Sequence, residues 1–276
     1  MSEKKHIKEA FSSALNTTTT LRKGWEQPAL KEIASINPKI PFNNIEDDLE
    51  ISFLPMKLVE EVSNVIHLTE HKRYQEVKKG FTPMTDGDVI FAKITPCMEN
   101  GKVAVVHSLK NQIAFGSTEF FVFRCSIAVA NKFLFYFLVQ SQFRQDAQHN
   151  MTGAVGQKRV PKKYLEDHLI PLPPLPEQQR IVARIEELFS SLDAGVESLK
   201  KAQTQLKTYR QAVLKWAFEG KLTNQHAGNG ELPAGWKWIK IEDCATVGTG
   251  ATPLKSTKEY YENGNIPWVT SGALND

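Results

Sequence analysis

The sequence predicts an α+β protein: one globular domain with a mixed β-sheet, joined to a long coiled-coil-forming α-helix. Two observations lead to this fold class. Runs rich in β-branched and aromatic residues at 88–94, 102–107 and 119–125 have the composition of strands. They are followed by an apolar run at 131–147 that is typical of a buried helix. Beyond it, the proline-free run 177–218 repeats apolar residues with the period of a coiled coil.

The predicted globular part covers residues 24–170, which is the usual size of one domain. Its strands are followed by a helix without regular alternation, and this order favours an α+β fold over a doubly wound sheet. Residues 1–23 form a polar extension that we expect to be frayed. No apolar run is long enough for a membrane span and no signal peptide is recognisable, so we expect a cytoplasmic protein.

The helix expected from 176 to 218 has large apolar side chains at nine of its eleven core positions. The prolines between 171 and 176 hold the preceding chain extended, and a proline is tolerated in the first helical turn, so they form a stiff joint. A helix packed along its own domain is the alternative. At ~1.5 Å per residue, however, the helix spans roughly 64 Å, too long for one small domain to cover. The core positions are Ile181, Ile185, Leu188, Leu192, Gly195, Leu199, Ala202, Leu206, Tyr209, Val213 and Trp216.

The charges along this helix change sign near its middle. Acidic residues outnumber basic ones in 177–197, whereas 198–218 contains basic residues and no acidic ones. The helix dipole alone explains such a polarity, but an antiparallel partner would also set opposite charges side by side. Because Gly195 lies near the midpoint, we predict antiparallel pairing with a second copy or a similar helix. Further apolar residues beside the seam, candidates for contact with another protein or with the chain's own domain, are Val182, Phe189 and Val196.

A short motif occurs twice. The run "GWEQPALKEIASI" begins at residue 24, and "GWKWIKIEDCATV" begins at residue 235 with apolar residues at matching positions. Residues 222–234 between the helix and the second copy are polar and turn-rich, as in a linker. We therefore expect residues 235–276 to be the start of a second, incomplete unit. Its one predicted strand, 266–272, would have nothing to pair with and is expected to be poorly ordered.

Several segments resemble the DNA-specificity subunits of type I restriction–modification systems. They are the helix entry "PLPPLPEQQRIV", the helix exit "AFEGKLT", and the runs "GDVIFAKITPCMENGK", "GSTEFFVFR" and "GAVGQKRVP". In that family two target-recognition domains alternate with two long helices and lie inverted about them. The resemblance implies a target-recognition domain at 24–170, a spacer helix at 171–221, and the truncated start of a second such domain at 235–276. It also implies that this shorter chain forms a homodimer through the helix.

The same resemblance implies the partners of the chain. It would recognise one half of a two-part site in double-stranded DNA and direct other subunits there. These are methyltransferase subunits, which bind S-adenosylmethionine, and a motor–nuclease restriction subunit, which uses ATP and Mg²⁺. No cofactor would be bound by this chain itself. The alternative is a coiled-coil scaffold whose globular domain binds protein, which would show little dependence on salt.

Enzymatic motifs are absent from the sequence. The run "LPPL" (172–175) lacks the amide and aromatic residues of a DNA methyltransferase turn, and "GTGATP" (248–253) is not followed by the Gly-Lys-Ser/Thr of a phosphate-binding loop. The three cysteines, Cys97, Cys125 and Cys244, are too widely spaced for a zinc site and fit a reduced cytosol. We therefore expect a non-catalytic chain with no metal site.

Four short segments are candidates for DNA contact, although each also has a purely structural explanation. The first combines basic and aromatic residues, the second is a glycine-containing loop with two cations, and the others are polar residues next to strands. A solvated turn, an ordinary surface loop or hairpin chemistry would account for them as well. The residues are Lys72, Arg73, Tyr74, Lys78 and Lys79; Gln157, Lys158 and Arg159; Lys93, Thr95, Asn100 and Lys102; and Ser117 and Thr118.

Overall fold

The computed structural model describes residues 22–40, 45–224, 232–254, 256–263 and 269. The chain divides into two compact units, residues 1–195 and 196–276, at a point within the long helix. Most of the predicted N-terminal extension and of the predicted strand at 266–272 lies outside the described residues. The predicted domain boundaries therefore stay predictions, and the two units are described separately.

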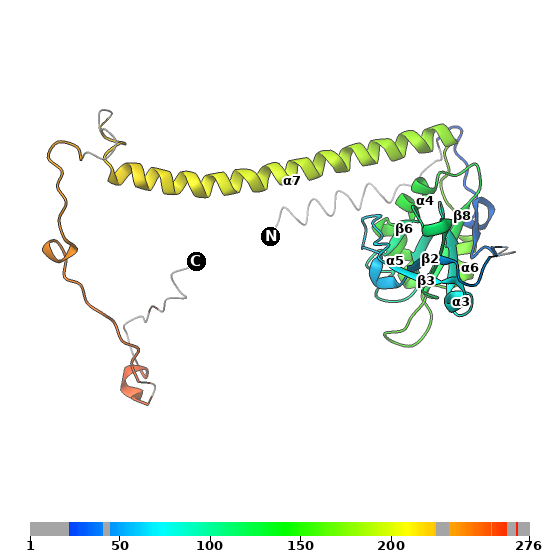
Figure 1. Cartoon of the computed structure of the whole chain (residues 1–276), viewed down its shortest axis with the longest axis horizontal. Coiled ribbons are helices and arrows are strands. Elements are labelled where there is room, and N and C mark those ends of the chain that lie inside the picture. The colour runs from blue at the N-terminus through cyan, green and yellow to red at the C-terminus, as the bar shows by residue number, and fades with distance from the viewer. Residues whose placement is uncertain (1–21, 41–44, 225–231, 255, 264–268, 270–276) are drawn as a thin grey trace. The chain divides into compact units, whose positions relative to one another are not determined.

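The first unit contains two four-stranded sheets (Figure 1). Sheet 1 is antiparallel, with the order β1 (Ala34–Ile36), β8 (Phe120–Cys125), β5 (Val89–Ala92) and β6 (Val103–Val105). Sheet 2 has the order β3 (Glu70–Arg73), β2 (Glu50–Leu54), β7 (Ile113–Gly116) and β4 (Thr82–Thr85). The strands β2 and β7 are parallel and the other pairs antiparallel. The predicted α+β class with a mixed sheet is confirmed, although the domain has two sheets where one was expected.

Helices cover the outer faces of the two sheets. The outer face of sheet 1 packs against four helices, which are α2 (Leu30–Ile33), α4 (Asn131–Leu138), α5 (Ser141–His149) and α6 (Lys162–Asp167). On the outer face of sheet 2 lies the single turn α3 (Tyr74–Val77). The short 3₁₀ turns of this unit are Met56–Leu58 and Lys110–Gln112.

This layered order follows from the apolar residues of β5, whose side chains are all buried. Neighbouring side chains on a strand point to opposite faces. Val89 and Phe91 belong to the core shared with the helices, whereas Ile90 and Ala92 belong to the core shared with sheet 2. A continuous apolar run is what a strand covered on both faces requires. Sheet 1 is thus the central layer of the domain.

The apolar run 131–147, expected as one helix, forms two. Helix α4 ends at Leu138 and α5 begins at Ser141, because Gln140 adopts an extended conformation (φ −56°, ψ 138°). The break lets both helices turn their apolar side chains to the same core, where Leu138 and Phe143 are buried. The prediction of a single helix was wrong because tertiary packing overrides the local helical propensity.

The long helix α7 runs from Leu175 to Phe218, close to its predicted bounds. Gly220 terminates the helix two residues after Phe218. Its φ of +71° suits glycine and lets the backbone amide of Lys221 donate to the carbonyl oxygen of Trp216 at 2.9 Å. Only its first two turns contribute buried residues, and most of the remaining side chains are exposed. None of the described helices is long and apolar enough to cross a membrane.

The described residues after α7 in the second unit form two 3₁₀ turns, Ile241–Asp243 and Lys258–Tyr260, and no strand. The two copies of the repeated motif differ in burial within the described residues. Leu30 of the first copy is fully buried under α6, whereas its counterpart Ile241 is 68% exposed. The motif supplies apolar residues, but a fold needs helices and strands to cover them.

Candidate nucleic-acid interface

Three segments that are distant in the sequence meet beside sheet 1, at 93–95, 117–119 and 152–159, and we call them the loop cluster. Backbone hydrogen bonds connect them. The amide of Lys93 donates to the carbonyl oxygen of Glu119 at 2.9 Å, and the amide of Thr95 donates to that of Lys158 at 3.0 Å. The segment 93–95 follows β5 and the segment 117–119 connects β7 to β8, so the sheets fix where these two lie. The segment 152–159 is a hairpin between α5 and α6, and a bridge of Arg159 to Ile94 joins it to the first segment.

Glycine is required at two positions around this cluster. A Cβ atom on Gly116 would lie 2.5 Å from the carbonyl oxygen of Leu54, where the parallel strands β2 and β7 end. Gly153 has a φ of +119°, and a Cβ there would lie 3.0 Å from the carbonyl oxygen of Gln157 across the hairpin. Gly153 therefore permits a close approach between two parts of the chain's own backbone.

An ion pair joins two members of the loop cluster. The Nε and Nη2 atoms of Arg159 donate to the carboxylate of Glu119 at distances of 2.8–3.2 Å, and Nη1 donates to the carbonyl oxygen of Gln157 at 3.0 Å. Hydrogen bonding from Arg159 lowers the pKa of Glu119 below its usual value. Arg159, predicted to bind phosphate, thus holds the hairpin to the strand. The sequence analysis did not name Glu119 as a site residue. Its acidic side chain directly before a strand could have suggested an ion pair with the cationic loop.

The candidates left exposed in the cluster are Thr118, Gln157 and Lys158. Lys93 lies over the ring of Phe121, with its Nζ atom 5.4 Å from the ring centroid. The Oγ atom of Ser117 accepts a hydrogen bond from the amide of Glu119 at 3.2 Å. The structure therefore brings seven predicted residues together, and three of them present uncommitted polar groups at the tips of the loops.

The neighbouring turn, 95–102, makes mainly internal contacts. The hydroxyl of Thr95 donates to the carboxylate of Glu99, and the side-chain Nδ2 of Asn100 donates to the carboxylate of Glu61 at 2.8 Å. The Nζ atom of Lys102 donates to the carbonyl oxygens of Met56 and Val59 at 3.1 and 2.7 Å. Asn100 and Lys102 thus connect the turn to residues 56–61, whereas the contact of Thr95 lies within the turn.

The basic segment 72–79 is not a loop but the end of β3 followed by α3. Most of its side chains have partners within the protein. Lys72 lies over the ring of Phe53 at 4.3 Å, while Arg73 and Lys78 pair with Asp48 and Asp47 at 3.3 and 2.7 Å. Tyr74 packs on Phe115. In the described part of the chain, Lys79 alone among these five side chains is exposed without a partner.

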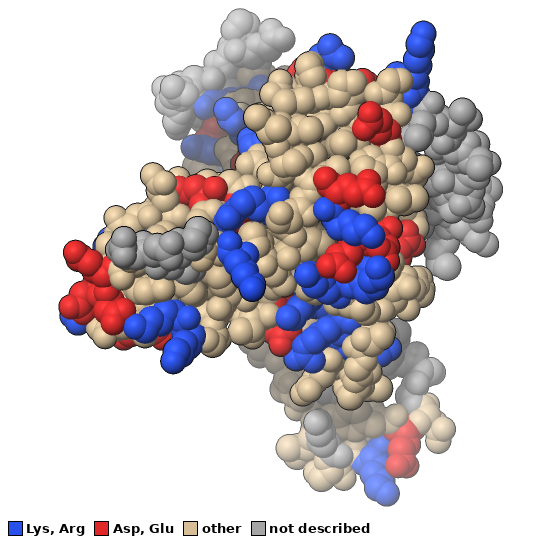
Figure 2. Space-filling model, turned by 90° about the vertical axis from the view of Figure 1, so that its right-hand side faces the viewer, with Lys and Arg blue, Asp and Glu red and all other residues tan. Residues whose placement is uncertain are grey.

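The strand register separates this segment from the loop cluster. Arg73 lies opposite Glu50 at the start of β2, whereas Ser117 follows Gly116, which lies opposite Leu54 at the end of β2. Four residue steps of ~3.4 Å give a separation of roughly 14 Å along the sheet. Blue basic side chains on the face shown in Figure 2 are accordingly interspersed with red acidic ones and form no uniform basic surface.

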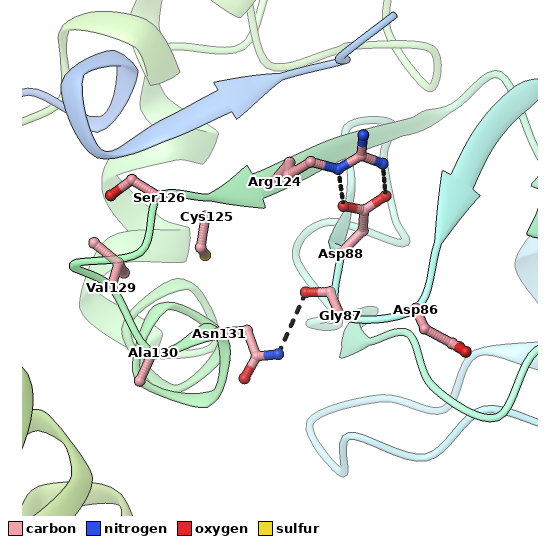
Figure 3. Close-up of a pocket in the computed structure, with 9 residues that line it drawn as sticks. All are labelled: Asp86, Gly87, Asp88, Arg124, Cys125, Ser126, Val129, Ala130 and Asn131. Carbon is pink, nitrogen blue, oxygen red and sulfur yellow. Dashed lines mark hydrogen bonds and ion pairs between the residues drawn. The ribbon is translucent and has the colours of Figure 1, made fainter. Parts of the chain in front are cut away.

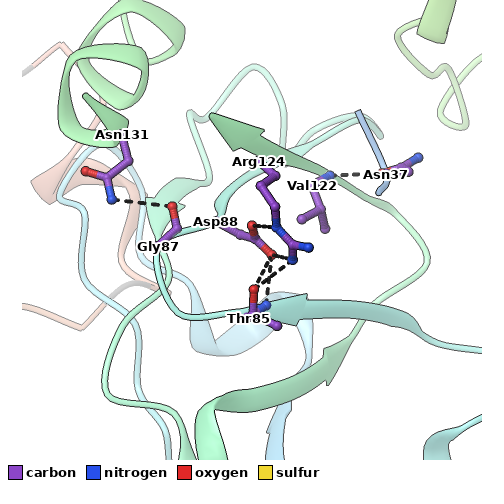
Figure 4. Close-up of polar contacts among 7 residues, drawn as sticks. All are labelled: Asn37, Thr85, Gly87, Asp88, Val122, Arg124 and Asn131. Carbon is purple, nitrogen blue, oxygen red and sulfur yellow. Dashed lines mark hydrogen bonds and ion pairs between the residues drawn. The ribbon is translucent and has the colours of Figure 1, made fainter. Parts of the chain in front are cut away.

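A cavity of about 380 Å³ lies at the other end of β5, between the start of this strand and the start of α4 (Figure 3). Arg124 donates two hydrogen bonds to the buried carboxylate of Asp88 at 2.8 and 2.7 Å, and Thr85 donates to the same carboxylate (Figure 4). Burial raises the pKa of the lining thiol of Cys125 to about 12, so this thiol stays protonated. The cavity thus holds a structural ion pair and no activated nucleophile.

The predicted pairing residues of α7 fall into two groups. Ile181 and Ile185 are half-buried, and the neighbouring Val182 is buried in the core of the domain. Of the two contacts predicted for Val182, it therefore makes the one with the chain's own domain. From Leu188 onward every core position except the half-buried Val213 is exposed, with Leu199 72% exposed. Phe189 contacts Tyr136 edge-on at 6.2 Å and is still 55% exposed. The apolar stripe therefore stays uncovered along most of the helix.

The chain matches the family of the type I restriction modification DNA specificity domain over residues 22–207, and it belongs to that family.

Individual members of this family are also similar to the chain in sequence or in fold. The chain is 41% identical over 237 residues to the specificity subunit of type I restriction enzyme EcoAI of Escherichia coli, covering 85% of this chain and 39% of that subunit. The EcoEI specificity subunit of Escherichia coli is 37% identical over 212 residues, covering 71% and 35%. The HsdS subunit from Thermoanaerobacter tengcongensis shares the fold, with a TM-score of 0.60 and 23% identity over 87% of this chain and 59% of that one. The chain spans about two fifths of the length of the two Escherichia coli subunits.

The ion pair between Glu119 and Arg159 predicts a pH dependence of stability. Because the folded-state pKa of Glu119 is lowered, its contribution is present above the ordinary value of 4.5 and is lost as the pH falls through the folded pKa. The Glu119→Gln variant should be less stable than the parent at neutral pH and lose less stability on acidification below ~4.5. Urea unfolding at several pH values measures both. Parallel curves for parent and variant would contradict the assignment.

Proposed function

We propose that this chain recognises one half of a DNA site in a sequence-specific manner, as the specificity component of a type I restriction–modification complex. The observation that carries the proposal is the loop cluster. Lys158 and Gln157 are exposed at the tip of a hairpin, and the ion pair of Arg159 with Glu119 holds this hairpin in place. Amide and ammonium groups on a fixed loop can bind base edges and phosphates.

The structure favours the loop cluster over α3 as the DNA-contacting surface. The basic residues before and after α3 are largely paired with Asp47, Asp48 or aromatic rings, and releasing them would cost those contacts. In the loop cluster the exposed groups are uncommitted. All the candidates remain proposals for DNA contact, with Lys158, Gln157 and Thr118 ranked first.

The chain itself acts without catalysis in this proposal. Methyltransferase subunits carrying S-adenosylmethionine, and a restriction subunit using ATP and Mg²⁺, would supply the chemistry. The second candidate function, a scaffold whose domain binds protein, is favoured by one observation: the basic side chains on the domain lie among acidic ones (Figure 2). The two functions differ in their response to salt, because phosphate contacts release counterions.

The exposed stripe of α7 supports pairing with a second long helix. Its 44 residues span roughly 66 Å at ~1.5 Å per residue, nearly two DNA turns of ~34 Å. An antiparallel partner would cover the apolar residues and place the acidic half of one helix beside the basic half of the other. The partner in this proposal is a second copy of the chain or a similar helix, and the pair would hold two recognition domains at a fixed distance.

Replacing one lysine should identify the DNA-contacting surface. Lys158→Ala is expected to weaken binding several-fold and to reduce the slope of log K against log salt by about 0.9, the value for one lost phosphate contact. Lys79→Ala, a matched exposed lysine that follows α3 and lies outside the loop cluster, should leave both quantities unchanged. Fluorescence anisotropy at several salt concentrations measures them. The reverse result would move the interface to α3, and binding insensitive to salt would support the scaffold.

Methylation mapping tests the role in a complex. The chain is co-expressed with the methyltransferase subunit from the same genome, and modified bases are located by single-molecule sequencing. Methylation should occur at a two-part sequence motif, and Gln157→Ala should relax one base position or abolish modification. Methylation at the same motif without the chain would contradict the proposed function.

Cross-linking determines the direction of helix pairing. Arg184 and Gln205 occupy the same heptad position, about equally far from Gly195, and are 21 residues apart, or roughly 30 Å. Chains bearing Arg184→Cys or Gln205→Cys are prepared with the three native cysteines replaced by serine, then mixed and oxidised. Antiparallel pairing should give disulfides between the two kinds of chain and very few within either kind. Disulfides within each kind alone would indicate parallel pairing.

A further inference from the structure

A fully buried polar side chain lies at the joint between the domain and α7. Gln178, in the first turns of the helix, has no exposed surface. Its Oε1 atom accepts a hydrogen bond from the amide of Ala130 at 2.9 Å. Its Nε2 atom donates to the carbonyl oxygens of Ala128 at 3.0 Å and Pro173 at 2.8 Å. Both N–H groups and the oxygen of the side chain are therefore satisfied within the protein.

The three partners belong to two different segments. Ala128 and Ala130 lie in the connection from β8 to α4, and Pro173 lies in the proline-rich entry to α7. One side chain thus ties the helix to the loop that leaves sheet 1 and to the chain that leads into the helix. Hydrogen bonds have preferred directions, whereas apolar contacts tolerate sliding. Gln178 is therefore suited to fix an orientation as well as a position.

One other directional contact lies at the joint, where the indole Nε1 of Trp25 donates a hydrogen bond of 3.2 Å to the carboxylate of Glu177, which is not fully buried. The remaining contacts are less directional. Val182, one turn further along, is buried by apolar packing. Lys132 pairs with Glu186 at 2.7 Å, but both side chains are nearly half exposed, and such pairs contribute little. Phe189 touches Tyr136 by a ring edge. Without the side-chain amide of Gln178, the described contacts would hold α7 by the single hydrogen bond of Trp25 to Glu177 and otherwise through surfaces that can slide or separate.

We propose that Gln178 is a positioning residue that sets the direction in which α7 leaves the domain, and through it the spacing between the two half-sites that a paired molecule reads. The inference rests on the proposed function for its DNA consequence. A tilt of ~10° at Gln178 would displace the far end of a helix of roughly 60 Å by about 10 Å, which is about three base-pair steps. A small change in the angle of α7 at this residue therefore causes a large change in the position of the far end of the helix.

The chain offers a matched control for this residue. Gln179 is the next residue of the same helix and has the same side chain, but it is exposed. Gln178→Met keeps the length and volume of the buried side chain while removing its three hydrogen bonds. Gln179→Met makes the same chemical change on the surface. A difference between the two variants reports on the buried hydrogen bonds and not on helix propensity.

The first measurement needs no DNA. Spin labels are attached at Lys79→Cys and Lys207→Cys in a chain whose native cysteines are replaced by serine, and labelled chain is diluted with unlabelled chain. Double electron–electron resonance should give one narrow distance distribution for the parent and for Gln179→Met, and a distribution at least twice as broad for Gln178→Met. An equally narrow distribution in a folded Gln178→Met variant would overturn the proposal, whatever the chain does with DNA.

A second variant covers the case in which Gln178→Met does not fold. Gln178→Glu keeps the oxygen that accepts from Ala130, but an ionised carboxylate cannot donate to the two carbonyl oxygens. Its distribution should be narrower at acidic pH, where the carboxyl is protonated and donates one hydrogen bond, than at alkaline pH. A distribution that does not change with pH and matches the parent would count against the proposal.

The second measurement tests the consequence for DNA. Binding is compared on duplexes with one half-site and on duplexes with two half-sites at a series of spacings. Gln178→Met should bind the single half-site within about twofold of the parent but lose the preference for one spacing, whereas Gln179→Met should keep it. Loss of half-site affinity without a change in spacing preference would mean that Gln178 only stabilises the domain. If the parent binds no half-site, the proposed function fails, and the spin-label distances still decide the role of Gln178.

Discussion

The architecture of the domain depends on the burial of sheet 1 on both of its faces. Because β5 is apolar on both sides, one face must be covered by helices and the other by sheet 2. The helical face carries α4 and the start of α7, and strands of both sheets lead into the loop cluster. The spacer helix and the candidate recognition loops are thus both anchored to one rigid central layer.

Charge within the domain is used mainly for internal attachment. Arg159 binds Glu119, Arg124 binds Asp88, and Lys78 binds Asp47, so that many cations of this nearly neutral chain are already paired. The few uncommitted polar groups at the loop tips then have a large influence on any DNA contact. Because the formal net charge is only +3, such recognition would depend on the position of these groups more than on a strong overall electrostatic attraction.

The first turns of the long helix α7 pack on the domain, whereas most of its remaining length is exposed to solvent. Its first turns are held by Gln178 and Val182, and from Leu188 onward its apolar stripe is exposed. Burial of apolar surface contributes about 25 cal/mol per Å², so covering such a stripe is a substantial driving force for association. The helix is therefore fixed at one end to its domain and leaves most of its remaining apolar stripe uncovered.

The sequence by itself determined the elements whose cause is local. The apolar heptads and the entry prolines gave α7 to within a residue, and β-branched, aromatic runs gave β5, β6 and β8, because periodicity and side-chain shape act over short distances. The tertiary structure alone decided three other features. These are the break between α4 and α5, the second sheet, and the partners of Lys72, Lys102 and Arg159. Each depends on residues far apart in the chain: Phe53, Val59 and Glu119 stand 19 to 43 positions from the cations they hold, and no local pattern shows which will meet.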